Sequence, residues 1–249
     1  MPQGSSSSRS WTVLAVAGIV LALAAGLFAG WSWRQASPAA GDRAAIEKIV
    51  RDYILEHPEI LPEAMENLQK RQNAQALSSI RDQVTAPFPG AVLGNPQGKV
   101  TLVEFTDFAC TFCRQSVAEI EHLIAADPDL RIVIRELPIL SPASADAARM
   151  ALAAAEQGKY AAFHHAMFAA GQPAPGTIAA AARAAGLDMD RARRTIADPR
   201  IDAELARNVE FARQLGFSGT PSWVVGDQLL SGAVGRARLG EAIAAARKD

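Results

Sequence analysis

The chain has 249 residues with 25 basic and 26 acidic side chains, so its formal net charge is −1. This length allows one or two domains with a full hydrophobic core, and the dispersed Lys and Arg residues exclude the basic surface typical of a nucleic-acid-binding protein. Hydrophobic residues make up 49% and aromatic residues 6% of the chain, a composition that favours a globular protein with much helix.

The N-terminal segment is predicted to anchor the chain in a membrane. After a short polar tail of residues 1–10, residues 11–33 contain no charged side chain. About twenty apolar residues are enough to cross a hydrocarbon core roughly 30 Å thick as one helix. Trp11, Trp31 and Trp33 lie at the two ends of this stretch, where amphipathic rings prefer the membrane interface. We therefore expect an uncleaved transmembrane anchor here.

The charges beside the anchor predict its orientation. Arg9 and the amino terminus lie on one side and Arg34 on the other, which slightly favours the N-terminus inside the cell. We expect a protein anchored in the inner membrane, with the bulk of the chain in the periplasm. The alternative is a signal peptide cleaved near residues 37–40, which would leave a soluble periplasmic protein. Both alternatives place the rest of the chain where thiols can be oxidised.

After a linker at 34–41, residues 42–84 have the apolar period of a helical stalk. Pro58 interrupts this stalk because the residue before a proline is pushed out of the helical region. Pro62 suits the first turn of a second helix, which is expected to run to about Val84. Such a helix pair cannot bury its apolar side chains alone, so it either docks on the following domain or forms a homo-oligomer. The apolar stripe of the first helix consists of Ile46, Ile49, Val50, Tyr53 and Ile54.

Residues 85–249 are predicted to form an α/β domain. A Gly- and Pro-rich segment leads into an apolar strand at 99–105, and a helical period starts at Cys110. A second strand follows at 130–135. This order makes a βαβ unit with Cys110 at the carboxyl end of its first strand, the position where reaction sites of α/β proteins concentrate.

The C-terminal half of this domain is predicted to add a helical insert and a hairpin. Several short helices separated by Gly and Pro residues extend from about 142 to 215. Two strands at 222–225 and 228–230 are joined by Gly-Asp, a hairpin signal. A helix at 236–248 closes the chain. The order βαβ, helices and ββα predicts the α/β class with a helical insert.

The chain has two cysteines, and they lie three positions apart, at Cys110 and Cys113. Two cysteines placed at random over this length would have this spacing on the order of once in a hundred. A structural disulfide with two intervening residues would close too small a loop to stabilise the fold much. The pair is therefore interpreted as a redox site.

The position of the pair at a helix start predicts a different role for each sulfur. Unpaired amides and the positive end of the helix dipole would stabilise a thiolate on Cys110, the attacking sulfur. Cys113 would lie one turn inside the helix, shielded from solvent, and resolve the intermediate. In the oxidised form a substrate thiolate attacks Cys110, and the second thiol of the substrate then displaces it, which leaves the substrate oxidised. From the dithiol form the same steps reduce or isomerise.

Two segments resemble known active-site signatures. Residues 104–113 (Glu-Phe-Thr-Asp-Phe-Ala-Cys-Thr-Phe-Cys) and residues 219–222 (Gly-Thr-Pro-Ser) are similar to those of DsbA-like thiol:disulfide oxidoreductases. The resemblance covers roughly residue 92 to the C-terminus and implies a thioredoxin fold with an inserted helical subdomain and no cofactor. Residues 46–71 further resemble the leader segment of the ScsC-like subgroup, which in some members mediates trimerisation.

The resemblance also implies roles for Glu104, Thr220 and Pro221. Pro221 corresponds to the family's cis-proline, whose loop faces the disulfide and offers backbone to a bound substrate; an ordinary trans turn is the alternative. Glu104 corresponds to the family's buried acid. On a strand covered on both faces its pKa would be raised, which suits a proton relay to Cys113. A partly solvated position on the strand is the alternative.

Thr111 and Phe112, between the cysteines, depart from the family, whose members often have Pro or Gly first and His or Tyr second. Without an imidazole, the Cys110 thiolate is expected to be less stabilised than in the strongest oxidants, which leaves oxidation and isomerisation both open. We predict an enzyme that forms or isomerises disulfides of cysteine-containing envelope proteins and is recycled by a membrane redox partner. The alternative is a copper-tolerance module that binds Cu(I) through the same thiols without catalysis.

Overall fold

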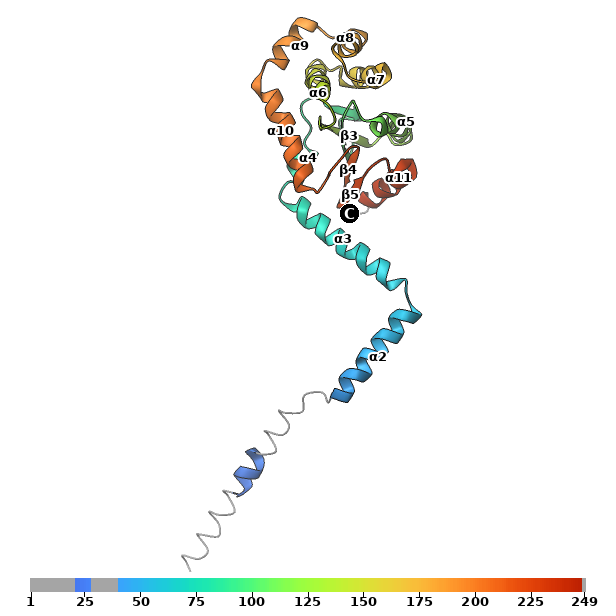
Figure 1. Ribbon diagram of the computed structural model, residues 1–249, viewed down its shortest axis with the longest axis vertical. Helices are drawn as coiled ribbons and strands as arrows, with labels where there is room; N and C mark the ends of the chain where they lie inside the picture. The colour runs from blue at the N-terminus through green and yellow to red at the C-terminus, as the bar shows by residue number, and fades with distance from the viewer. Residues whose placement is uncertain (1–20, 28–39, 248–249) are drawn as a thin grey trace, which may run out of the picture. The chain divides into compact units, whose positions relative to one another are not determined.

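The computed structural model describes residues 21–27, which are helical, and residues 40–247 (Figure 1). The predicted polar tail at 1–10, most of the predicted anchor at 11–33 and nearly all of the linker at 34–41 lie outside the described residues. Among the helices that the structure does describe, none is both long enough and apolar enough to cross a membrane. The membrane anchor therefore stays a prediction.

The chain divides into two compact units, residues 1–65 and residues 66–249. Besides the helical residues 21–27, the first unit contains α2 (Ala40–Glu56) and the start of α3 (Ile60–Ser78), so the predicted interruption at Pro58 is confirmed. Apolar side chains of α2 are exposed, and they include most of the predicted stripe. These exposed residues are Ile46, Ile49, Val50, Tyr53 and Leu55.

The second unit begins inside α3, and here the prediction of one helix to about Val84 is wrong. The helix ends at residue 78, and a short helix, α4 (Arg81–Thr85), follows. Ile80 has a φ of −126° and donates its N–H to the carbonyl of Leu77 at 3.0 Å, in a tighter turn than an α-helix makes. Because of this turn, Leu77, Ile80 and Val84 all pack into the core, so this end of the predicted stalk docks on the domain.

A sheet occupies the centre of the second unit, with β2 in the middle and the order β1-β3-β2-β4-β5. Strands β2 and β3 are parallel, whereas the other neighbouring pairs are antiparallel. The predicted strands are confirmed to within a residue or two, and β1 was not predicted. The strands are β1 (Val92–Gly94), β2 (Val100–Thr106), β3 (Leu130–Glu136), β4 (Ser222–Val225) and β5 (Gln228–Ser231).

Helices connect and cover this sheet. The helix α5 (Thr111–Ala126) joins β2 to β3, and α11 (Gly235–Ala246) follows the β4–β5 hairpin. In Figure 1, α5 and α11 lie on one side of the sheet, and α4 and α10 lie on the other. The order is that of a thioredoxin-like α/β fold with a run of helices between β3 and β4. That run consists of α6 (Pro142–Ala155), α7 (Tyr160–Ala170), α8 (Pro175–Ala184), α9 (Met189–Ile196) and α10 (Pro199–Gln214).

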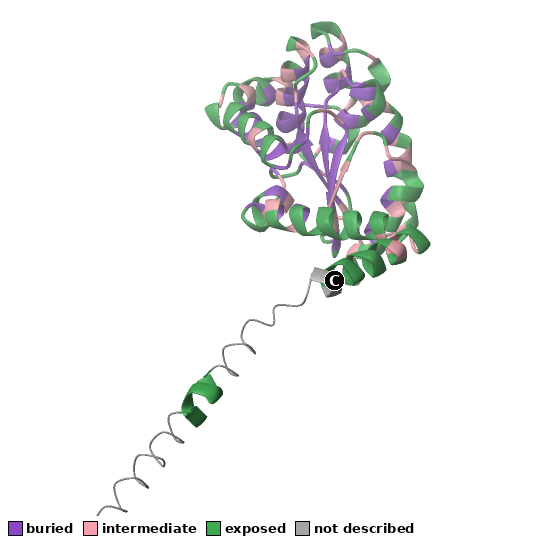
Figure 2. Cartoon of the chain, turned by 60° about the horizontal axis from the view of Figure 1, so that its bottom comes forward, coloured by how far each residue is buried: buried purple, intermediate pink, exposed green. Residues whose placement is uncertain are grey.

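Two hydrophobic clusters form the core, one on each face of the sheet, and the three central strands, β2, β3 and β4, are almost entirely buried between them (Figure 2). Successive side chains of a strand point to opposite faces. Leu102 of β2 belongs to the first cluster, with both cysteines. Val103 and Phe105 belong to the second cluster, with side chains of α3, α4 and α10. The side chain of Glu104 must therefore lie on the face of the first cluster.

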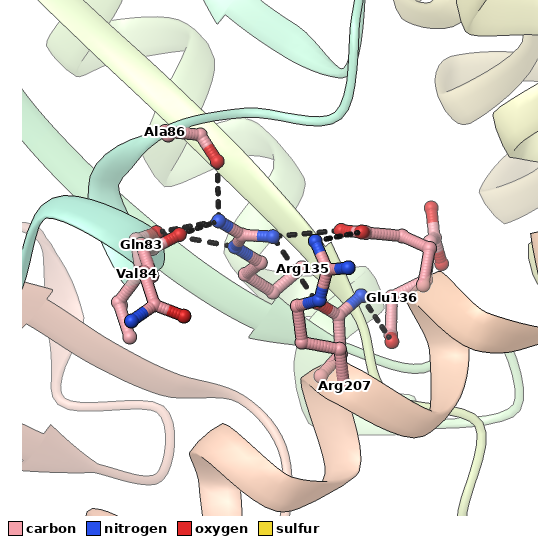
Figure 3. Close-up of polar contacts among 8 residues, drawn as sticks. Gln83, Val84, Ala86, Arg135, Glu136 and Arg207 are labelled. Atoms are coloured by element: carbon pink, nitrogen blue, oxygen red, sulfur yellow. Dashed lines mark hydrogen bonds and ion pairs between the residues drawn. The ribbon is translucent and has the colours of Figure 1, made fainter. Parts of the chain in front are cut away.

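Arg135 of β3 ties the α4 segment to the sheet on the opposite face (Figure 3). Its side chain is 2% exposed, so its donors need partners within the protein. The guanidinium donates to Glu204 Oε1 of α10 at 2.7 Å and to Asn208 Oδ1 at 3.2 Å. Its other donors bind backbone carbonyls around the end of α4. These carbonyls belong to Gln83, Val84 and Ala86.

Candidate active site

Cys110 is the N-cap residue of α5, so the predicted start of a helix at this cysteine is confirmed. Its backbone is extended, with φ −78° and ψ 119°, while the next residue is already helical. The amide of Cys113 donates to Cys110 Sγ at 3.2 Å. A helix N-terminus that directs an amide at a sulfur stabilises negative charge on that sulfur.

The peptide bond between Thr220 and Pro221 is cis, as predicted, and the alternative of a trans turn is wrong. The thiol of Cys110 donates to the carbonyl of Thr220, with 3.2 Å between sulfur and oxygen. The loop is held on both sides, because Ser222 Oγ donates to Gly219 O at 2.8 Å and Gly232 N–H donates to Pro221 O at 2.8 Å. The backbone at Thr220 therefore borders Cys110.

Cys113 lies in the first turn of α5 and is 1% exposed, compared with 4% for Cys110. Both cysteines are free thiols in the structure. Burial raises the pKa of Cys113, and the nearby negative charge of Glu104 raises it further. The Cys113 sulfur is therefore held as a neutral thiol, and the Cys110 sulfur is the one closer to solvent.

Glu104 is fully enclosed, with an exposed fraction of 1%. The alternative of a partly solvated strand position is therefore wrong. Burial raises the pKa of its carboxyl to about 8. Its Oε2 has no hydrogen-bond partner among the described residues. A carboxyl in such surroundings favours the protonated form near neutral pH, so it can give up or accept a proton there.

Asp107 shapes the turn before Cys110, although it is not among the predicted site residues. Its Oδ1 accepts the Ala109 N–H at 2.8 Å, and its Oδ2 accepts those of Ile139 and Leu140, each at 2.9 Å. Its backbone carbonyl accepts the Cys110 N–H at 2.9 Å. An Asp side chain that accepts the amide two positions later is a common turn signal, so this part of the role of Asp107 could have been predicted. The contacts of Asp107 with the loop after β3 are not visible in the sequence.

Three large apolar side chains near this turn are exposed. Phe112, inside the cysteine motif, is 59% exposed, and Ile139 and Leu140 are 45% and 52% exposed. The loop that carries the last two is fixed to the cysteine turn through Asp107. Apolar side chains grouped around a reactive sulfur are typical of a surface that contacts another protein.

The core beneath the cysteines contains further ionisable groups, and sequence reasoning missed Glu136 among them. Glu136, the last residue of β3, is 1% exposed, and Tyr160 of α7 donates its hydroxyl to Glu136 Oε1 at 2.6 Å. A glutamate at the end of a strand whose other inward positions are Leu130, Ile132 and Ile134 was the available signal. His164 of α7 is also buried and packs against Phe168, with ring centroids 4.9 Å apart. Burial lowers the pKa of His164 to about 3, so the ring is neutral.

No group of three or more His, Cys, Asp or Glu side chains is placed to hold a metal ion in the part of the chain that the structure describes. Within the described residues, a Cu(I) ion would therefore bind through the two thiols of Cys110 and Cys113. His122, on the same helix, is exposed, and its Nδ1 lies 2.6 Å from the carbonyl of Ala118.

Comparison with known proteins gives two family matches. Residues 101–244 match the model of the DSBA-like thioredoxin domain. Residues 42–75 match the model of the copper resistance protein ScsC N-terminal domain.

Several solved structures are similar. A thioredoxin-like oxidoreductase from Silicibacter pomeroyi is 44% identical, with a TM-score of 0.65, and the match covers 68% of this chain and 98% of that one. A linker-deletion mutant of Proteus mirabilis ScsC is 27% identical, with a TM-score of 0.64 and coverage of 86% and 99%. A periplasmic thioredoxin-like protein from Salmonella enterica serovar Typhimurium is 26% identical, with a TM-score of 0.61 and coverage of 68% and 97%.

Curated relatives are much longer than this chain. The match to the Na(+)/H(+) antiporter NhaA 1 of Salinispora arenicola is 32% identical over 158 residues, and it covers 62% of this chain and 24% of the antiporter. The match to NhaA 3 of Salinispora tropica covers 54% of this chain and 21% of that protein. The chain therefore spans a quarter or less of the length of these relatives. Since the family model matches more than half of the chain and the fold agrees with it, the chain belongs to the family of DSBA-like thioredoxin domains.

Proposed function

We propose that this protein is a thiol:disulfide oxidoreductase of the cell envelope and that Cys110 is its nucleophile. The single observation that carries the proposal is the position of Cys110 Sγ, which receives the amide of Cys113 and faces the carbonyl of Thr220. The amide and the helix N-terminus favour a thiolate. The carbonyl marks a stretch of backbone along which an extended substrate chain can align.

The exchange reaction follows from this arrangement. A substrate thiolate attacks Cys110 of the oxidised protein, the bond between the two cysteines breaks, and the Cys113 sulfur leaves with the electron pair. The proton that Cys113 then takes comes from Glu104, because the raised pKa of Cys113 disfavours a buried thiolate. The second substrate thiolate attacks the substrate sulfur of the mixed disulfide, and Cys110 leaves as a thiolate. Two electrons have passed to the protein, and the substrate has gained a disulfide.

We propose cysteine-containing envelope proteins as substrates, bound as extended segments. The exposed side chains of Phe112, Ile139 and Leu140 would contact apolar residues beside the substrate cysteine. The periplasmic Salmonella protein named above and the apolar residues 11–33 support a periplasmic site of action, with the N-terminal segment as an inner-membrane anchor or a cleaved signal. A membrane redox partner would recycle the cysteine pair.

A trapping experiment tests the proposed function. In a Cys113→Ala variant, the mixed disulfide on Cys110 lacks its resolving sulfur, so substrate proteins should stay attached as adducts that dithiothreitol releases. Cys110→Ala is the matched control, because it leaves only the deeper thiol, and it should trap no protein. Absence of adducts from the first variant, together with tight Cu(I) binding by the wild type, would replace the proposal with the copper-binding function.

The direction of exchange can be measured in cells. Rapid acid quenching followed by alkylation reports whether Cys110 is mostly oxidised or mostly reduced. A mostly oxidised pair means that the protein forms disulfides, and a mostly reduced pair means that it isomerises or reduces them.

Self-association through α2 is proposed as well, because apolar side chains along this helix are exposed. Leu77, Ile80 and Val84 belong to the core of the second unit, so a useful truncation removes residues 42–65 and keeps α3 from residue 66 onward. We expect the full protein to have the mass of an oligomer in solution and the truncated protein that of a monomer. The same monomeric mass for both would refute self-association.

A further inference from the structure

The register of the two central strands places two carboxyl groups on one face of the sheet. In the parallel pair of β2 and β3, Glu104 lies opposite Ile134, and Thr106 lies opposite Glu136. Residues opposite each other in neighbouring strands share a face, and so do residues two apart along a strand. Glu104 and Glu136 are therefore diagonal neighbours on the same face. Ile134 and Cys113 belong to the hydrophobic cluster of that face.

Glu136 has an incomplete set of partners. Its Oε1 accepts the hydroxyl of Tyr160 at 2.6 Å, while its Oε2 has no partner in the described part of the chain, and the same is true of Glu104 Oε2. Because Tyr160 uses its only hydroxyl proton in this bond, a proton carried by Glu136 resides on Oε2. The structure therefore leaves two unpartnered carboxyl oxygens in one buried cluster.

Within the described residues, neither Glu104 nor Glu136 forms an ion pair with a basic side chain. The basic neighbour in sequence, Arg135, points to the opposite face and pairs with Glu204. Tyr160 hydrogen-bonds to Glu136, and the charges of Asp107 and Glu104 act on it. Thr106, whose hydroxyl also lacks a partner in the described residues, lies opposite Glu136 in the strand register. Cys113 belongs to the hydrophobic cluster of the same face, and the neutral His164 packs against Tyr160. Burial raises the pKa of Glu136 well above its ordinary value, and the negative charges of Asp107 and Glu104 raise it further. Two carboxylates in such surroundings cannot both ionise without a large cost.

We propose that Glu136 is a positioning residue that stays protonated and donates its Oε2 hydrogen to the Glu104 carboxylate when Glu104 has given its proton to Cys113. This inference rests on the proposed function. In the reaction, the bond between the cysteines breaks, Cys113 receives its electron pair and then the Glu104 proton, and one negative charge remains on Glu104. The unpartnered Oε2 atoms of the two glutamates then pair, either directly or through one buried water. On reoxidation, the proton returns from Cys113 to Glu104.

Two variants of Glu136 separate this role from a packing role. In Glu136→Leu the carboxylate of Glu104 loses its donor, whereas Glu136→Gln keeps an N–H donor and an oxygen that can accept from Tyr160. A hydrogen bond to a charged group changes the acid dissociation constant of that group by about tenfold or more. We expect the pH midpoint of the exchange rate with a model dithiol to move upward by about one pH unit in the Leu variant. The Gln variant should restore the midpoint of the wild type.

Carbon-13 NMR of the dithiol form gives a readout that does not depend on activity. With the side-chain carboxyls of glutamate labelled, the signal that Glu136→Gln removes identifies Glu136. This signal should keep the chemical shift of a protonated carboxyl while Glu104 titrates. Glu121→Gln, an exposed change on α5, is the matched control and should alter neither titration.

Three results would overturn the inference. They are an unchanged midpoint in a folded Leu variant, a downward shift in the Gln variant, and a Glu136 signal that titrates before that of Glu104. If the Leu variant does not fold, the Gln variant and the NMR titration still test whether Glu136 stays protonated and donates to Glu104. A wild type without exchange at any pH would instead refute the proposed function, and the NMR titration would still report the state of Glu136.

Discussion

The buried carboxyl of Glu104 should make the stability of the dithiol protein fall as the pH rises. Its ordinary pKa is 4.5, and burial raises the pKa to about 8 in the folded chain. Below about pH 4.5 both the folded and unfolded states are protonated at this group. Between these two values the folded state keeps a proton that the unfolded state has lost, so each pH unit removes about 1.4 kcal/mol of unfolding free energy.

The magnitude over the whole interval is large. The difference between about 8 and 4.5 is roughly 3.5 pH units, which corresponds to about 5 kcal/mol. A domain of this kind has a total unfolding free energy of about 5–15 kcal/mol. The variant Glu104→Gln cannot ionise, so its stability relative to the wild type should improve by about this amount from pH 4.5 to pH 8.

Urea unfolding of the reduced protein at a series of pH values measures this effect. The difference between variant and wild type is the relevant quantity, because other groups, Glu136 among them, contribute to both curves. Glu241→Gln, an exposed change on α11, is the control, and its unfolding free energy should vary with pH in parallel with that of the wild type. Parallel curves for Glu104→Gln and the wild type would mean that Glu104 does not stay protonated in the folded state, and the reasoning about its proton would fail.

Three further changes test other parts of the structure. Arg135→Lys cannot reach all of the carbonyls around α4, so urea unfolding should show a loss of about 2–4 kcal/mol; an unchanged stability would contradict the role of the guanidinium. Leu77→Ala should cost about 2–5 kcal/mol by leaving a cavity, whereas Val209→Ala, at an exposed position of α10, should change stability by less than about 0.5 kcal/mol, and equal losses would argue against docking of this part of α3. Phe112→His places an imidazole beside Cys110 and should raise the reduction potential, by about 30 mV for each tenfold stabilisation of the dithiol form. Equilibration with glutathione measures that potential, and a lower value would be the contrary result.

The active-site cysteines and the cis-proline could be predicted because each lies in a short sequence signature with its own turn or helix start. The burial of Glu104 could not be decided in the same way, since it depends on helices that lie more than thirty residues further along the chain, including α7. Asp107 and Glu136 were missed for a related reason. Their partners, Ile139 and Tyr160, come close only after the chain has folded.

Helices and strands were predictable where the pattern of apolar residues extends over many positions. Short elements were missed. Strands β2 and β3 have seven residues each, whereas β1 has three residues between clusters of Gly and Pro. The break between α3 and α4 has no Gly or Pro to mark it. It forms because packing of Leu77, Ile80 and Val84 against the sheet outweighs the continuation of a helix.

The contact between Cys110 and the Thr220 carbonyl joins residues 110 positions apart in the chain. At about 5–20 residues per second, a ribosome makes Thr220 roughly 5–20 s after Cys110. For that interval the newly made dithiol has no backbone beside it to select its partners. A product that ends before β4 should therefore react with any accessible cysteine, so the cysteine motif without the later loop would be a source of wrong disulfides.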